Sequence, residues 1–161
     1  PMACAAGTFA ASARAAKCEP CPAGTYQDMK QATSCKVCDA GHYCEAGASA
    51  PLPCPGGTHM NTTLPYMTSA AQCVACPEGT FCSVGSATPT PCAPGTFNPL
   101  TEATTCHKCP AGEYQEGSGA TSCHDCIPGS VCPEGSPVPL PCASGTFGSL
   151  RRMISADQCL P

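Results

Sequence analysis

The chain has 161 residues, of which 18 are Cys, 19 are Pro and 16 are Gly, and its formal net charge at pH 7 is −4. Trp is absent and only 5% of the residues are aromatic, so the side chains that fill one large core are missing. The 7 Lys and Arg residues argue against a nucleic-acid-binding surface, and no apolar run is as long as a transmembrane helix. A cysteine content this high is typical of a disulfide scaffold or a dense metal binder.

Taken in chain order, the cysteines define nine loops when each one is paired with the next. Every opening cysteine is followed by x-x-Gly, from "CAAG" at 4–7 to "CASG" at 142–145. Glycine at the fourth position accepts a positive φ, so each opening predicts a tight turn. The sequence does not distinguish this scheme from interlaced pairings such as Cys35 with Cys44. The disulfides predicted by consecutive pairing are Cys4–Cys18, Cys21–Cys35, Cys38–Cys44, Cys54–Cys73, Cys76–Cys82, Cys92–Cys106, Cys109–Cys123, Cys126–Cys132 and Cys142–Cys159.

An aromatic residue stands two positions after the glycine in seven of these loops. Each aromatic is expected to cover a disulfide and to form most of its module's core, and "GTF" or "GTY" favours a short strand that folds back as a hairpin. The one candidate helix is "LRRMISADQC" at 150–159. We therefore predict a small disulfide-rich fold of tandem β-hairpin modules that form an elongated rod with almost no helix. The residues at the aromatic position are Phe9, Tyr26, Tyr43, Phe81, Phe97, Tyr114 and Phe147, with His59 and Val131 in the other two loops.

The cysteine pattern repeats after 88 residues, and "CPAGTYQ" at 21–27 recurs as "CPAGEYQ" at 109–115. Alternating prolines before Cys54, Cys92 and Cys142 favour stiff, extended spacers. Because the sequence begins with Pro1, we expect it to be an internal piece of a longer protein. The predicted segments are 1–17, the end of a preceding repeat; 18–105, a first repeat with loops 21–35, 38–44, 54–73, 76–82 and 92–106; and 106–161, an incomplete second repeat.

Five Cys-x-x-Cys pairs raise a zinc alternative, because two such pairs about a dozen residues apart are typical of four-cysteine zinc sites. The pair Cys73 and Cys76 has no partner pair, however, and the same loop opens at Cys54 and Cys142 without a second cysteine nearby. Two zinc sites would also leave ten free thiols. We therefore predict disulfides in an oxidising extracellular setting, with no metal and no cofactor. Each Cys-x-x-Cys then marks the boundary between two modules.

The remaining polar residues indicate no catalysis. The four histidines, His42, His59, His107 and His124, lack partners at the spacings of metal or acid–base sites, and there is no calcium loop or Gly-x-Ser-x-Gly motif. We expect no enzyme activity and name no catalytic residue. The modification motif is "NTT" at 61–63, an N-glycosylation sequon in the longest loop, so Asn61 is predicted to carry a glycan.

The motif C-x-x-C-P-A-G-[T/E]-Y…A-T-S-C-x-x-C, at 18–38 and again at 106–126, resembles the ephrin-receptor-like cysteine-rich repeats. These repeats are similar in style to EGF-like and tumour-necrosis-factor-receptor modules. The variant with an inserted C-x-x-G-x-x-C, at 38–44, 76–82 and 126–132, resembles long arrays on protist and algal surfaces. Apicomplexan cysteine-repeat modular proteins and the mastigoneme protein of green-algal flagella are of this kind. The resemblance implies a secreted, glycosylated filament or surface coat.

We expect a structural component of an extracellular filament or surface coat, such as a mastigoneme-like flagellar hair or a cell-surface fibre. The expected partners are other copies of the chain or a companion fibre protein, together with glycans, with no nucleic acid and no membrane within this segment. The alternative is the ligand-binding or adhesive ectodomain of a cell-surface receptor. A filament predicts contacts that recur with the sequence repeat, whereas a receptor predicts one unusual module.

Overall fold

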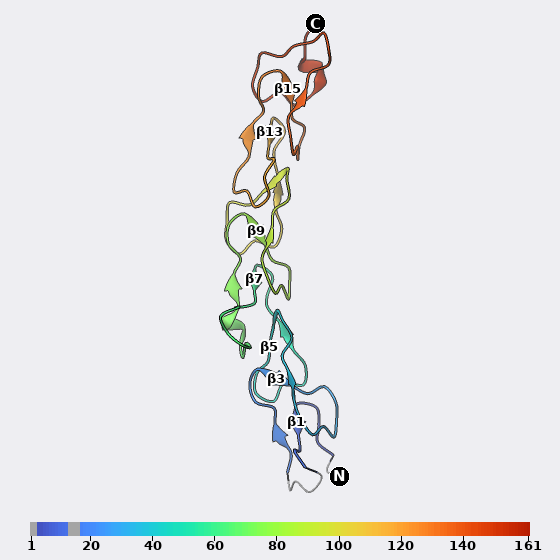
Figure 1. Cartoon of the computed structure of the whole chain (residues 1–161), viewed down its shortest axis with the longest axis vertical. Helices are drawn as coiled ribbons and strands as arrows, with labels where there is room; N and C mark the ends of the chain where they lie inside the picture. The colour runs from blue at the N-terminus through green and yellow to red at the C-terminus, as the bar shows by residue number, and fades with distance from the viewer. Residues whose placement is uncertain (1–2, 13–16) are drawn as a thin grey trace. The chain divides into compact units, whose positions relative to one another are not determined.

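The computed structural model describes residues 3–12 and 17–161 (Figure 1). The chain divides into two compact units: the first contains Pro1–Ala75 and Cys82–Thr88, and the second contains Cys76–Phe81 and Pro89–Pro161. In the described part of the chain no helix is long and apolar enough to cross a membrane.

Regular structure consists of antiparallel hairpins whose strands are two residues long. The prediction of small disulfide-rich β-hairpin modules is therefore confirmed. In the first unit the hairpins are β1 (Thr8–Phe9) with β2 (Glu19–Pro20), β3 (Thr25–Tyr26) with β4 (Lys36–Val37), β5 (His42–Tyr43) with β6 (Leu52–Pro53), and β7 (Thr58–His59) with β8 (Val74–Ala75). In the second unit they are β9 (Thr80–Phe81) with β10 (Thr90–Pro91), β11 (Thr96–Phe97) with β12 (His107–Lys108), β13 (Glu113–Tyr114) with β14 (His124–Asp125), and β15 (Ser130–Val131) with β16 (Leu140–Pro141).

The prediction of a candidate helix at 150–159 is wrong. That segment contains only the three-residue 3-10 helix η2 (Ala156–Gln158), and the other long loop contains the matching η1 (Ala70–Gln72). Both 3-10 helices end directly before a closing cysteine, where the disulfide fixes the backbone in an extended conformation. The loop is too short for the apolar face that would stabilise a longer helix.

Each first strand follows directly from the Cys-x-x-Gly turn. In the turn that begins at Cys21, Thr25 donates both its N–H and its Oγ1 hydroxyl hydrogen to the Pro22 carbonyl, at 3.0 and 2.7 Å. The same hydroxyl bond forms at Thr8, Thr58, Thr80, Thr96 and Thr146. A threonine after the glycine therefore closes the turn and starts the strand, which explains why "GT" recurs in the sequence.

All 18 cysteines are disulfide-bonded, so their sulfurs are not thiolates that could bind zinc. Cys76 and Cys82 are included in this number. Eight disulfides each join a cysteine to the next cysteine along the chain. They are Cys4–Cys18, Cys21–Cys35, Cys38–Cys44, Cys54–Cys73, Cys92–Cys106, Cys109–Cys123, Cys126–Cys132 and Cys142–Cys159.

The buried interior consists mainly of these cysteines rather than of aromatic rings. Most opening cysteines are no more than 1% exposed, and the large buried apolar side chains are Met67 and Met153, each 1% exposed. The expectation that an aromatic forms most of each core is wrong. Six of the seven rings are half-buried and Phe147 is 59% exposed, because a hairpin of two-residue strands has too little surface to enclose a ring.

Candidate functional site: the joints between modules

Consecutive modules are connected by three recurring backbone hydrogen bonds, which we call the joint. A module here runs from one opening cysteine to the residue before the next. First, the N–H of the turn glycine donates to the carbonyl six residues after the next opening cysteine. Second, the N–H six residues after the module's own opening cysteine donates to a carbonyl of the next module. Third, the carbonyl of the module's own opening cysteine accepts a hydrogen bond from an N–H of the next module. This donor is the residue directly before the one whose carbonyl takes part in the second bond. In the first joint the bonds are Gly7 to Gln27 (2.7 Å), Ala10 to Ala32 (2.9 Å) and Gln31 to Cys4 (2.8 Å).

The full set of three bonds forms at six joints within the described residues, three in each unit. Their lengths lie between 2.7 and 3.1 Å, as expected of good N–H···O geometry. The joint is made of main-chain atoms, so it does not depend on which side chains a module carries. The turn glycines of these joints are Gly7, Gly24 and Gly57 in the first unit and Gly95, Gly112 and Gly129 in the second.

The donor of the third bond, which we call the docking residue, has a positive φ. Four docking residues are glycines, and Gln31, Glu102 and Arg152 adopt the same left-handed conformation, at φ of 61°, 60° and 62°. This backbone geometry turns successive N–H and C=O groups toward the preceding module. It costs on the order of 1 kcal/mol or more for a residue with a Cβ. The glycine docking residues are Gly47, Gly85, Gly119 and Gly135.

Several turn glycines, including Gly7 and Gly95 but not Gly129, also lie directly against the docking residue two modules further on. A Cβ built on Gly95 would overlap the carbonyl oxygen of Gly135, and it would lie 3.3 Å from the Pro137 nitrogen. Gly145 has a similar φ, +86° against +81°, but a Cβ there would meet nothing within 4 Å. The x-x-Gly pattern therefore has two causes, namely the turn conformation and the close approach of another module's backbone.

The two longest loops, 54–73 and 142–159, use a buried methionine as the carbonyl partner in the joint. Met67 accepts from the Cys44 N–H at 3.1 Å, and Met153 accepts from the Cys132 N–H at 2.8 Å. The residue before the methionine differs between the loops: it is Tyr66 in one and Arg152 in the other. The two loops therefore present different chemistry beside the buried methionine.

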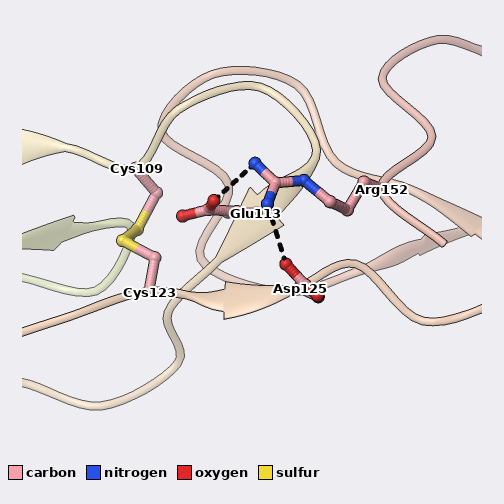
Figure 2. A network of polar contacts seen from close by, with 5 residues as sticks. All are labelled: Cys109, Glu113, Cys123, Asp125 and Arg152. Carbon is pink, nitrogen blue, oxygen red and sulfur yellow. Dashed lines mark hydrogen bonds and ion pairs between the residues drawn. A yellow bond between two sulfur atoms is a disulfide. The ribbon is translucent and has the colours of Figure 1, made fainter.

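Arg152 also forms a side-chain clamp to the module that begins at Cys109, as Figure 2 shows. Its Nη2 lies 2.6 Å from Glu113 Oε1 and its Nη1 lies 3.2 Å from Asp125 Oδ1. Glu113 and Asp125 belong to β13 and β14, on the hairpin closed by the Cys109–Cys123 disulfide (Figure 2). One guanidinium thus bridges two strands of an earlier module, and partial exposure keeps its contribution small.

A second ion pair lies within the module that begins at Cys21. Lys36 Nζ is 2.7 Å from Asp28 Oδ1. The hydrogen bond from Lys36 holds the pKa of the Asp28 carboxyl below its usual value, and the same bond raises the pKa of Lys36. Both side chains are almost half exposed, so the pair is screened by solvent.

The predicted glycosylation site, Asn61, lies half-buried in the loop 54–73 with exposed residues after it. Its Oδ1 accepts hydrogen bonds from the Thr63 N–H (3.0 Å) and the Thr63 Oγ1 hydroxyl (2.7 Å). The Nδ2 atom, which would carry a glycan, makes no hydrogen bond with any described residue.

The histidines lie in different modules and are not brought together. His42 and His59 each contact a nearby backbone carbonyl through Nδ1, at 2.9 and 2.8 Å. His107 and His124 lie beside Phe97 and Tyr114, with ring centroids 6.0 and 5.8 Å apart. Among residues 3–12 and 17–161, no group of three His, Cys, Asp or Glu side chains is arranged to hold a metal ion.

Replacing Gly95 with Ala is predicted to lower the free energy of unfolding more than replacing Gly145 with Ala does. Both variants place an L-residue at a positive φ, but only the Gly95→Ala methyl group overlaps Gly135. We expect Gly95→Ala to lose about 1–3 kcal/mol more, the usual cost of overpacking, and the Gly135 amide to exchange faster with solvent. Amide hydrogen exchange measures this, and equal protection of Gly135 in both variants would contradict the close approach.

Replacing Arg152 with Gln is predicted to lower the free energy of unfolding by about 0.2–1 kcal/mol at low salt. The loss should shrink as ionic strength rises, because the clamp is partly exposed. Arg151→Gln is the matched control, since Arg151 forms no ion pair with a described residue. Denaturant unfolding at two salt concentrations measures both. A loss of unfolding free energy that is equal at the two salt concentrations would argue against the clamp. An equal loss in the Arg151→Gln control would argue against it as well.

The comparison with known families agrees with this architecture. A model of the tyrosine-protein kinase ephrin type A/B receptor-like family matches residues 7–50 and 79–126, which is more than half of the chain. No curated protein matches it. A repeat protein with all its cysteines in disulfides has an extracellular or surface location, because reducing compartments do not maintain such bonds. The resemblance seen in the sequence is thus confirmed, and the chain belongs to the ephrin-receptor-like family of cysteine-rich repeats.

Proposed function

We propose that the chain is a structural component of an extracellular filament or surface coat, of the mastigoneme-like or cell-surface-fibre kind. The observation that supports this is the recurrence of one backbone joint, with the same three bonds, three times in each unit. A filament needs the same contact many times, and a main-chain joint supplies it regardless of side chains. A binding site for one ligand would instead require a particular set of side chains in one place.

The proposed role is mechanical. Each disulfide that closes a loop of about 15 residues stabilises its module by roughly 3 kcal/mol in the chain-entropy view. The joints connect consecutive modules, and the contacts of the turn glycines and of Arg152 reach one module further, so stability is local and adds along the array. A pulling force would open joints one by one, while the disulfides keep the cross-linked loops closed.

The proposed partners are other copies of the chain or a companion fibre protein, together with glycans. The Asn61 Nδ2 makes no hydrogen bond with a described residue, which supports the proposal of a glycan at this position. A glycan on this loop would shield the surface of a filament from proteases and from non-specific contacts.

A receptor or adhesin ectodomain is the second candidate, and one observation favours it. The two longest loops differ at the residue before the buried methionine, where Tyr66 is 45% exposed and Arg152 is held in an ion-pair clamp. Tyr66 lies outside the recurring aromatic position of the modules, and an exposed tyrosine of this kind is the feature that a ligand-binding module would carry.

The filament proposal predicts where the protein lies on cells that express it. In immunogold electron microscopy, antibodies raised against the 161-residue chain should label filaments at regular intervals or should label a continuous surface coat. Pre-immune serum is the control. Labelling confined to the plasma membrane, together with cross-linking to one soluble ligand, would contradict the filament and support the receptor.

Glycosylation of Asn61 is predicted when the chain is secreted from a eukaryotic host. Thr63→Ala removes the sequon and Thr63→Ser preserves it, so the two variants form a matched pair. The wild-type chain and Thr63→Ser should both lose mass on enzymatic removal of N-glycans, whereas Thr63→Ala should not. Intact-mass measurement checks this, and an unmodified wild-type chain would exclude the glycan.

A further inference from the structure

One threonine presents a free hydroxyl on a strand that is flanked by prolines. Thr90 belongs to β10 and lies between Pro89 and Pro91 in the sequence. The residue is exposed, and its Oγ1 makes no hydrogen bond with any described residue. In the other strand of the same hairpin, by contrast, the Thr80 hydroxyl donates to the Pro77 carbonyl at 2.7 Å. The hydroxyl of Thr90 is therefore available for chemistry, whereas the turn threonines use theirs to hold the fold.

The backbone around Thr90 is held in an extended conformation. Each flanking proline fixes its own φ, and the residue before a proline is excluded from the helical region. Thr90 pairs with Phe81 in the antiparallel hairpin, and the strand continues into Cys92, whose N–H donates to the Gly79 carbonyl at 2.9 Å. Cys92 is buried and is disulfide-bonded to Cys106. An enzyme can therefore reach the hydroxyl on a fixed, extended segment without unfolding the module.

Two other hairpins carry the same proline-flanked position, but with a leucine in place of the threonine. Leu52 and Leu140 stand 14 residues after the opening cysteines of their modules, as Thr90 does. Both leucines lie between two prolines, and both are 48% exposed. All three modules are followed by another module within the chain, so exposure is a property of the position itself. The position at Thr90 differs from the other two only in offering a hydroxyl.

Packing against the opposite strand does not account for this threonine. The register places Thr90 opposite Phe81, as it places Leu52 opposite Tyr43. Directly opposite residues of an antiparallel pair lie on the same face of the hairpin, with their Cβ atoms about 4.5–5.5 Å apart. Leucine has more apolar surface than threonine to lay beside an aromatic ring. The hydroxyl therefore needs a reason other than the cover of the Phe81 ring.

We propose that Thr90 is a site of O-glycosylation, at which a transferase moves a sugar from a nucleoside-diphosphate sugar to Oγ1. The hydroxyl oxygen attacks the anomeric carbon, and the bond from that carbon to the nucleoside diphosphate breaks. The diphosphate leaves with the electron pair, and the hydroxyl proton passes to a base of the transferase. Threonine in proline-containing segments is a typical carrier of O-linked sugars, and an extended segment fits a groove that binds peptides as strands.

A sugar on Thr90 lies beside the Phe81 ring, because the two residues share one face of the hairpin. The C–H groups of the sugar then cover the ring in the way that Leu52 lies opposite Tyr43. The inference goes beyond the proposed function and does not rest on it. A filament protein and a receptor ectodomain both pass through the secretory compartments in which sugars are added.

The test is intact-mass measurement of the 161-residue chain after enzymatic removal of N-glycans. The chain is secreted from a eukaryotic host whose secretory pathway adds sugars to threonine. The wild-type chain should keep the mass of one or more whole sugar units, and peptide fragmentation that preserves the glycosidic bond should place the sugar on Thr90. Thr90→Ser should keep this mass. Thr90→Leu should lose it and should still fold, because it installs the residue that the equivalent hairpins carry.

Thr121→Val is the matched control and should leave the sugar mass unchanged. Thr121 is also exposed and its hydroxyl bonds to no described residue, but it has no proline beside it. A wild-type chain without sugar after N-glycan removal, a sugar on Thr88 instead of Thr90, or a sugar that persists in Thr90→Leu would overturn the site. If Thr90→Leu is not secreted, fragmentation of the wild-type chain still decides. None of these outcomes bears on the filament, and immunogold labelling away from filaments would overturn the proposed function without affecting this site.

Discussion

The structure depends on the disulfide within each module, which encloses either most of the hairpin, as Cys21–Cys35 does, or only the turn and the first strand, as Cys38–Cys44 does. Strands of two residues form too few hydrogen bonds to be stable in water, and no module has enough apolar surface for a core. The cross-link removes most of the conformational freedom of the unfolded loop, so the turn, the short strands and the buried sulfurs can form together. Every other feature, including the joint, requires a backbone that is already fixed in this way.

The joint uses the backbone groups that the hairpins leave free. A two-residue strand pairs few of its N–H and C=O groups, and the unpaired ones near the buried cysteines need partners. The next module supplies them through its docking residue. Covalent bonds therefore define the modules, and hydrogen bonds connect them into an array. Side chains such as Arg152 adjust individual joints without being needed for the pattern.

Much of the fold could be predicted from the sequence because its constraints are local. The Cys-x-x-Gly turns, the strands after each glycine and the near absence of helix all follow from residues a few positions apart. The joints could not be predicted, since they depend on how modules stack. Glu113 and Arg152 are 39 positions apart, and the left-handed conformation of Gln31 or Glu102 has no signal in its residue type. The glycines at 47, 85, 119 and 135 offered a partial signal, as they follow an earlier turn glycine by 40 to 44 residues.

The most direct test is disulfide mapping of the secreted chain under non-reducing conditions. Proteolysis followed by mass spectrometry should give peptides in which Cys21 is linked to Cys35 and Cys38 is linked to Cys44. These bonds define two separate modules with a joint between them. A bridge between Cys35 and Cys44, or between Cys38 and Cys54, would cross the joint and contradict the account.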